Sequence, residues 1–273
     1  MRRIGCGIKS EYREHMKTHL DVALQAARRA GSYALGAERN GAISVRMKEA
    51  NDYVTDVDIQ IEQLIKDTIR LSFPHDGIFG EEGGESGNLQ SNRWVIDPID
   101  GTTNFFRGMP NYTISIAWEE EPFHPLVGVV FNPRHNELFW AAKGQGAFLN
   151  GQKITVSSVR ELNQAIVVLV PPHRRRDLAD SYFETMNTIF KATSDIRSFG
   201  SCALELSYIA SGRVDGYYER ALGYYDMAAG MIILQEAGGI VTPAFEDAPF
   251  SDHSCDILAS NGHLHRALSS LIA

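Results

Sequence analysis

Between Tyr112 and Ile154 the chain passes through several strand-like segments without an intervening helical segment, and this stretch constrains the fold most. Asn132-Pro133 divides the segments, and Asn150-Gly151 is a strong two-residue hairpin signal because both residues tolerate positive φ. The pattern predicts a β-meander. A doubly wound sheet is excluded, because its parallel strands would have to alternate with helices.

Helical patterns lie on both sides of this meander. Apolar residues recur every three or four positions over about residues 12–38, and Gly36 and Gly41 are expected to close that helix. Short apolar strands separate the later helices. We therefore expect a mixed α/β (α+β) protein whose helices cover about 12–38, Asp56 to Pro74, about 177–191, 201–210 and Asp226 to Gly238.

The charge balance concerns possible partners. The 26 Lys and Arg against 34 Asp and Glu give a formal net charge of −8, which argues against a nucleic-acid surface. Arg174-Arg175-Arg176 is the basic cluster found after the N-terminus, and we interpret it as a solvated turn following Pro171-Pro172. Three widely spaced cysteines without a CxxC pair favour a reducing compartment and offer no thiolate metal site.

No segment directs the chain to a membrane. Met1 to Ser10 lacks the apolar region of a secretory signal, and no apolar run approaches the length that crosses a bilayer. We therefore expect a soluble cytoplasmic protein without a membrane partner.

Acidic residues follow the strand-like segments. Because strand ends at one sheet edge can converge, we expect these carboxylates to line one pocket. Crowded carboxylates repel one another, so the cluster implies a cation, and an all-oxygen site suits Mg²⁺ or Mn²⁺ and disfavours Zn²⁺. The acids are Glu81-Glu82, Asp97 with Asp100, Glu219 shortly before Asp226, and Asp58 at the start of the second helix.

The segment Asp97-Pro-Ile-Asp-Gly-Thr102 combines metal-ligand and phosphate-binding features. Its two aspartates can reach metals, and Ile99 between them offers a backbone carbonyl. Gly101 lets the backbone approach an anion, and Thr102 adds an N–H and a hydroxyl at a helix start, where free N–H groups receive phosphate. A capped turn is the alternative for this motif alone. The other acidic residues favour a catalytic metal and phosphate site over a capped turn.

Other polar residues carry weaker signals. The histidines show no spacing linked to the acids, and we expect a surface or core position for each of His15, His19, His173, His263 and His265. The tyrosine pairs Tyr217-Tyr218 and Tyr224-Tyr225 are interpreted as packing residues. Four further acids are expected to be solvated or to cap helices, namely Glu161, Glu184, Glu205 and Asp215.

Several motifs together resemble those of the inositol monophosphatase family, in order and spacing, from about residue 18 to the C-terminus. The most specific is Trp94-Val-Ile-Asp-Pro-Ile-Asp-Gly-Thr-Thr-Asn-Phe105. The others are Asp52-Tyr-Val-Thr-Asp-Val-Asp58, Phe79-Gly-Glu-Glu82, Gly144-Gln-Gly-Ala-Phe-Leu-Asn-Gly151, Arg197-Ser-Phe-Gly-Ser201, Gly216-Tyr-Tyr-Glu219, Tyr225-Asp-Met-Ala-Ala-Gly230 and Glu236-Ala-Gly-Gly239.

The resemblance implies a layered αβαβα sandwich, usually a homodimer, that hydrolyses phosphomonoesters with Mg²⁺ and is inhibited by Li⁺. We expect one phosphatase domain over 1–273, with an N-terminal half of about 11–155 and a C-terminal half of about 156–273. Residues 1–10 have no counterpart in the family and are expected to be a disordered extension.

The resemblance also implies a role for each matching residue. Two or three Mg²⁺ ions, with Mn²⁺ as a substitute, would bind one site. Glu81, Asp97 and the Ile99 carbonyl would hold the first metal; Asp97, Asp100 and Asp226 the second; and Asp58, with Glu81, a third. Gly101 and Thr102 would bind phosphate, and Gly200, Ser201, Glu219 and Asp226 would face the alcohol.

Two residues depart from the family pattern. Tyr225 stands where the family has Trp directly before the last metal aspartate, which alters packing behind the site more than the metal. Lys48 lies one residue closer to the Asp52–Asp58 motif than the family's lysine, which leaves its role in doubt.

The mechanism is hypothesised as in-line attack by a metal-activated water that Glu81 and Thr102 orient, with the Thr102 hydroxyl passing a proton toward the carboxylate. No covalent phospho-enzyme is expected, because no Cys, His or Ser lies in the motif.

Several functions stay open. The expected substrate is inositol 1-phosphate, and the same chemistry on fructose 1,6-bisphosphate, histidinol phosphate, a nucleotide 3′-phosphate or NADP is the alternative. A regulatory role in a transcription complex, as some bacterial relatives have, is a second class. A structural metal-binding protein is the third, and Gly101-Thr102 argues against it.

Overall fold

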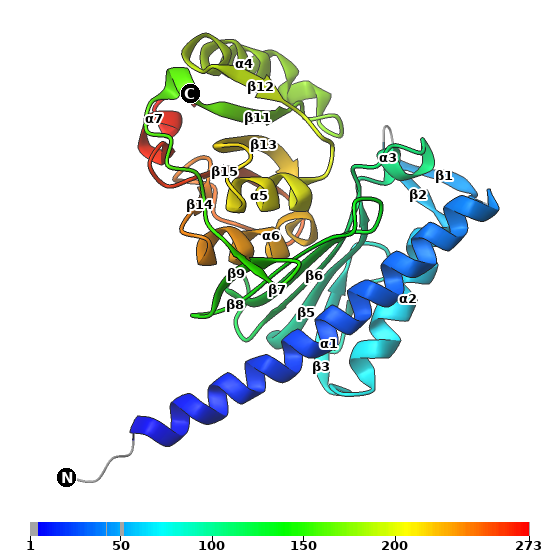
Figure 1. Cartoon of the computed structure of the whole chain (residues 1–273). Coiled ribbons are helices and arrows are strands. Elements are labelled where there is room, and N and C mark those ends of the chain that lie inside the picture. Colours follow the sequence, from blue (N-terminus) through cyan, green and yellow to red (C-terminus); the bar gives the residue numbers. More distant parts are fainter. Residues whose placement is uncertain (1–4, 42, 50–51, 273) are drawn as a thin grey trace.

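The computed structural model describes residues 5–41, 43–49 and 52–272. Helices and sheets alternate in five layers (Figure 1), with α1 and α2 outside the larger sheet, α5 and α6 between the two sheets, and α4 and α7 outside the smaller sheet. This arrangement confirms the expected αβαβα sandwich. Among the described residues, no helix combines the length and apolar character that a membrane span requires.

The first helical layer consists of α1 (Gly5–Asn40) and α2 (Asp56–Arg70). The helix α1 begins at Gly5, earlier than predicted, and residues 1–4 lie outside the described residues. No proline interrupts the upstream sequence, so nothing prevents the helix from continuing. Gly36 lies within the helix, and Gly41 follows its end with a φ of +64°. α1 packs on the sheet through alanines that are fully buried: Ala23, Ala26, Ala27, Ala30 and Ala34.

The larger sheet contains the predicted meander. From β5 to β10 each strand pairs antiparallel with the next, and Asn150 and Gly151 join the last two strands with φ of +50° and +82°. In spatial order the strands are β10 (Gln152–Ile154), β9 (Gly146–Leu149), β8 (Glu137–Ala142), β7 (Pro125–Asn132), β6 (Thr113–Glu119), β5 (Asn88–Asp100), β3 (Asp76–Gly80) and β4 (Gly84–Ser86).

The pairing of β3 with β5 brings two predicted acids together. These strands are parallel, with Gly80 opposite Ile96. Glu81 and Asp97 therefore leave the same end of two adjacent strands, and the Glu81 N–H donates to the Ile96 carbonyl at 3.1 Å. The expected convergence of strand ends is confirmed for this pair.

The middle layer consists of α5 (Cys202–Ala210) and α6 (Tyr224–Glu236), which are almost entirely buried. Gly128 on β7 permits close approach of α6, because a Cβ atom there would lie 2.4 Å from Ile232 and 2.6 Å from the Ala229 carbonyl. Helix α6, which begins two residues before Asp226, is therefore held against the larger sheet.

The smaller sheet has five strands, with β11 parallel to both neighbours and β13 antiparallel to β15. In spatial order these are β12 (Asp195–Arg197), β11 (Ile166–Val170), β13 (Gly216–Leu222), β15 (Cys255–Ser260) and β14 (Ile240–Pro243). The outer helices are α4 (Ala179–Ala192) and α7 (His265–Ser269). The remaining elements are the hairpin of β1 (Val45–Glu49) and β2 (Asp52–Thr55), the short helix α3 (Thr102–Phe106), and the 3₁₀ turns Leu162–Gln164 and Arg176–Leu178.

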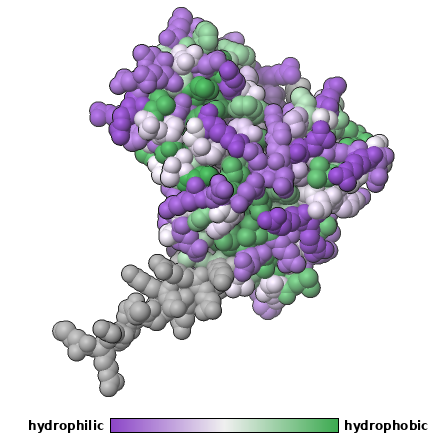
Figure 2. Space-filling model, in the orientation of Figure 1, coloured by the Kyte–Doolittle hydropathy of each residue, from purple (hydrophilic) through white to green (hydrophobic). Residues whose placement is uncertain are grey.

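Hydrophilic residues cover most of the visible face of the molecule, with apolar residues interspersed (Figure 2). In the described part of the chain the core forms three buried clusters. One lies between α1, α2 and the larger sheet, one surrounds α5 and α6 between the two sheets, and one lies between the smaller sheet and its outer helices.

Candidate active site

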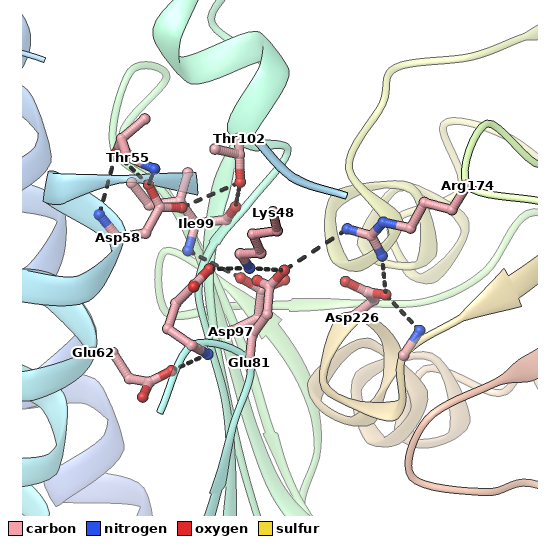
Figure 3. A network of polar contacts seen from close by, with 12 residues as sticks. Lys48, Thr55, Asp58, Glu62, Glu81, Asp97, Ile99, Thr102, Arg174 and Asp226 are labelled. Carbon is pink, nitrogen blue, oxygen red and sulfur yellow. Dashed lines mark hydrogen bonds and ion pairs between the residues drawn. The ribbon is translucent and has the colours of Figure 1, made fainter. Parts of the chain in front are cut away.

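A cavity of about 350 Å³ opens where β3, β5, α3, α5 and α6 meet. The residues expected from the sequence to act at the site line it, except Glu82 and Asp58, and Asp58 contacts the Thr102 hydroxyl (Figure 3). These lining residues are Glu81, Asp97, Ile99, Asp100, Gly101, Thr102, Gly200, Ser201, Glu219 and Asp226. Residues from both halves of the chain therefore form one pocket.

Three aspartates form its most acidic part. Carboxylate oxygens of Asp97 and Asp100, at the end of β5, and of Asp226, in the first turn of α6, all lie within 4.8 Å of one another. All three are buried, with exposures of 1%, 6% and 5%. Burial, followed by the charges of Glu81, Asp100 and Asp226, raises the pKa of Asp97 well above its usual value. Burial also raises the pKa of Asp226 to about 6, although Arg174 opposes the rise.

The hydrogen bonds of Asp97 leave one oxygen for a cation. Oδ1 accepts the Ile99 N–H at 3.0 Å, whereas no donor among the described residues reaches the buried Oδ2. A buried carboxylate oxygen without a donor is costly unless a cation binds it. The donor set is entirely oxygen, so these residues fit Mg²⁺ or Mn²⁺.

Glu81 lies between two basic side chains (Figure 3). The Lys48 Nζ is 3.3 Å from its Oε1 and 2.5 Å from Glu82 Oε1, which places Lys48 at the site. From the opposite side, the Arg174 guanidinium lies 3.7 Å from Glu81 and 3.8 Å from Asp226.

The Arg174 contacts correct one sequence-based expectation. The three arginines are not a uniformly solvated turn, because Arg174 lines the cavity, and His173 does so as well. Both follow β11, whose carboxyl end opens toward the site. The rule that ligands bind beyond the carboxyl ends of parallel strands could have identified this loop.

Asp58 lies in the first turn of α2 and supports Thr102. Its Oδ2 accepts the Thr55 N–H at 3.0 Å, and its Oδ1 lies 3.2 Å from the Thr102 hydroxyl. That hydroxyl is also 3.1 Å from the Ile99 carbonyl. Burial is the main reason that the pKa of Asp58 rises to about 6, and the charge of Glu81 adds to the rise. The carboxylate in contact with the Thr102 hydroxyl is thus that of Asp58.

Gly101 precedes α3 in a conformation that few other residues adopt. Its φ is +94°, and a Cβ atom would lie 2.9 Å from the Gly200 carbonyl and 3.0 Å from the Asn111 carbonyl. Both the left-handed backbone and the close approach of two other segments therefore require glycine.

We expect Gly101→Ala to reduce stability more than Gly108→Ala, its matched control. Gly108 also has a positive φ, of +72°, but nothing lies within 4 Å of an added Cβ. The control should cost about 1 kcal/mol for its backbone conformation, and overpacking at Gly101 should add roughly 1–3 kcal/mol. Thermal unfolding of both variants measures the difference. Equal losses would show that the carbonyl contacts do not restrict Gly101.

The opposite wall is built around the start of α5. Ser201 caps this helix, and Asp100 Oδ2 accepts from both the Ser201 hydroxyl at 2.6 Å and the Ala203 N–H at 2.7 Å. The Asn104 amide donates to the Phe199 carbonyl at 2.7 Å and thereby links α3 to the same segment. Glu219 is buried and hydrogen-bonds the Tyr217 hydroxyl.

Two acids expected to be solvated or to cap helices are in fact buried supports of loops. Glu205 accepts the N–H groups of Phe199 and Gly200 at 2.6 and 3.0 Å, and burial raises its pKa to about 7. Asp215 accepts the Ile166 N–H at 2.8 Å. The role of Asp215 was missed because its partner lies 49 residues away in the sequence. The partners of Glu205 are backbone N–H groups just before α5, and no local pattern marks them as its partners.

A comparison with protein families matches the chain over residues 15–273 to the model of the inositol monophosphatase family. The chain belongs to this family. The Nus factor SuhB of Escherichia coli K12 is 43% identical over 229 residues, which are 83% of this chain and 85% of that protein.

Solved structures of family members have the same fold. The inositol monophosphatase of Anabaena is 35% identical with a TM-score of 0.83, covering 94% of this chain and 96% of that chain. SaIMPase-II bound to inositol monophosphate is 27% identical with a TM-score of 0.79, covering 93% and 92%. The shared architecture agrees with the five layers described above.

Tyr225, which replaces the tryptophan usual in the family, packs behind the aspartates. Its ring lies 5.8 Å from that of Phe79, and a Cβ on Gly223 would come within 2.4 Å of it. Burial, followed by the charges of Asp226 and Glu81, raises its pKa, so the phenol stays neutral.

Proposed function

We propose that this family member hydrolyses a small phosphomonoester in a Mg²⁺-dependent reaction, with inositol 1-phosphate as the expected substrate. The observation that carries the proposal is the buried Asp97 Oδ2, which lacks a donor within the cluster of Asp97, Asp100 and Asp226. A cation there would lie beside the backbone of Gly101 and Thr102, where phosphate is expected.

The assignment of ligands is the one that the family resemblance implies, and the lining of the cavity supports it for every residue but Asp58. Glu81, Asp97 and the Ile99 carbonyl would hold one Mg²⁺, and Asp97, Asp100 and Asp226 a second. Asp58, together with Glu81, would serve a third. When bound, the cations supply a water of lowered pKa and neutralise charge on the transferring phosphoryl group.

The chain's own residues bind and orient the reactants. The N–H groups of Gly101 and Thr102 bind the phosphate, and Glu81 accepts a hydrogen bond from the attacking water. The Thr102 hydroxyl, held between Asp58 and Ile99, fixes the direction of that water. Gly200, Ser201 and Glu219 bind hydroxyl groups of the alcohol.

The serine and the cysteine that line the cavity are poorly prepared to act as covalent nucleophiles. The Ser201 hydroxyl donates a hydrogen bond to Asp100, and burial raises the pKa of the Cys202 thiol well above its usual value. A thiol in that state is a poor nucleophile. Direct attack by water is therefore the step that this site supports.

Phosphate release from a panel of esters tests the function. The panel contains inositol 1-phosphate, fructose 1,6-bisphosphate, histidinol phosphate, NADP and adenosine 3′,5′-bisphosphate, each with and without Mg²⁺ and Li⁺. We expect the fastest release from inositol 1-phosphate, a requirement for Mg²⁺ and inhibition by Li⁺. Release from none of the esters would contradict the proposal.

A regulatory role in a transcription complex is the second candidate, because relatives at 43% identity are named Nus factor SuhB. The two roles can be separated with Asp97→Asn, since binding a protein partner does not need a complete cation site. Capture of transcription proteins that is unaffected by Asp97→Asn would support the second role. Family membership also leads us to expect a homodimer.

A further inference from the structure

Helix α2 carries a row of buried charged residues that faces the site. Asp58, Glu62 and Lys66 are spaced four apart and therefore lie on one face of the helix, with exposures of 0%, 3% and 7%. Charged side chains are almost never fully buried unless they are paired. Asp58 supports Thr102, whereas the function proposed above has no use for Glu62 and Lys66.

Glu62 binds the backbone of the turn that follows Glu81. Its Oε2 accepts the Glu82 N–H and its Oε1 accepts the Gly83 N–H, both at 2.8 Å (Figure 3 shows Glu62 to the left of Glu81). The Lys66 Nζ lies 2.6 Å from the same Oε1. Both oxygens therefore have partners, and Lys66 balances the buried charge.

The glycines on either side of Glu81-Glu82 leave the space that this ion pair occupies. A Cβ atom on Gly80 would lie 2.7 Å from the Glu62 carboxylate. On Gly83 it would lie 2.6 Å from Glu62 Oε1 and 2.3 Å from Lys66 Nζ. The two glycines of the Gly-Glu-Glu-Gly sequence thus leave room for the Glu62 carboxylate and the Lys66 ammonium.

We infer that Glu62, paired with Lys66, is a positioning residue that sets the cation affinity of the site through Glu81. Hydrogen bonds fix the backbone at Glu81 and directly after it. The Glu81 N–H donates to the Ile96 carbonyl, and the next two N–H groups donate to Glu62. Outer-shell partners that fix a metal-binding carboxylate typically change metal affinity 10–100-fold. The inference rests on the proposed function in assigning a cation to Glu81.

The test compares Glu62→Gln with Glu236→Gln. Glu236 is a matched control, because it too accepts two backbone N–H groups, those of Gly144 at 2.9 Å and Gly146 at 2.8 Å, in a turn outside the cavity. Glutamine keeps the size of the side chain but directs an NH₂ group at one of the N–H donors. Mg²⁺ binding is measured by calorimetry on the whole protein without substrate.

We expect Glu62→Gln to raise the Kd for Mg²⁺ about tenfold or more, while Glu236→Gln leaves it unchanged. At saturating Mg²⁺ the KM for substrate should be that of the wild type, because Glu62 does not contact the cavity. A Kd for Glu62→Gln equal to that of the wild type would overturn the inference, as would an equal rise in Glu236→Gln.

A second variant approaches the contact from the turn. In Gly83→Ala the added Cβ atom would clash with Lys66 and Glu62. Gly36→Ala is its control, because no atom lies within 4 Å of a Cβ added there. We expect a raised Kd for Mg²⁺ in Gly83→Ala alone, and an unchanged Kd would count against the inference even if Glu62→Gln does not fold. The Mg²⁺ titrations contain no phosphate ester, so they test the inference independently of turnover. Failure of the proposed function would appear only in the phosphate-release panel.

Discussion

Replacing Asp97 with asparagine is expected to lower kcat for phosphate release by several powers of ten at saturating Mg²⁺. Asp97 is shared between two of the proposed cation positions, and its buried Oδ2 would become a neutral amide atom. Loss of an interaction central to the transition state lowers kcat, and higher Mg²⁺ concentration does not restore it. Initial rates over a Mg²⁺ titration measure the effect.

The same variant should fold as well as the wild type in EDTA. Without a cation, Asp97 is one of several buried carboxylates whose charges oppose one another, and a neutral amide removes part of that repulsion. Asp195→Asn, at an exposed ion pair with Arg197, is the control for the loss of one charge. Turnover near that of the wild type in Asp97→Asn would overturn the assignment.

The second large effect concerns pH and cation removal. In EDTA, the melting temperature should fall as pH rises from about 5 to 8. The folded state raises the pKa of Asp58 and Asp226 to about 6 and that of Glu205 to about 7, above the ordinary values of 3.8 and 4.5. Their protonated forms therefore favour the folded state, and this contribution is lost as pH rises through 6 to 7. His265, with a lowered pKa, has the opposite effect at the acidic end.

Mg²⁺ should reverse this trend. It binds deprotonated carboxylates, so it should raise the melting temperature more at pH 8 than at pH 5. For a chain of this size each kcal/mol corresponds to roughly 2–4 °C, so shifts from several carboxylates are measurable by calorimetric scans. A melting temperature in EDTA that is flat or rises between pH 5 and 8 would contradict the prediction.

The site was predictable where its residues follow strand ends in a specific motif. Asp97 to Thr102 carries both the acids and the glycine that a turn beside Gly200 requires, and the parallel pairing of β3 with β5 places Glu81 next to them. The roles of these residues stay proposals, because the structure shows their proximity and not their ligands.

The rest depended on contacts between distant segments. The sequence gives no sign that Glu62 and Lys66 are buried, because a Glu and a Lys four residues apart are common on solvent-exposed helix faces. The turn after β3 buries them, and no local pattern reveals that. Arg174 was missed for a similar reason, since three arginines after two prolines give no sign that one of them reaches Glu81 and Asp226, each more than fifty residues away.

The hydrogen bonds of Asp100 link cation binding to binding of the substrate alcohol. The same carboxylate faces the proposed cation position and accepts hydrogen bonds from the start of α5, beside the alcohol-binding wall. A cation bound to the Asp100 carboxylate would weaken or reorient these hydrogen bonds. Cation binding would therefore change the free energy with which the alcohol binds at the neighbouring wall. Because such linkage is reciprocal, substrate alcohol and Mg²⁺ should alter each other's affinity by the same factor.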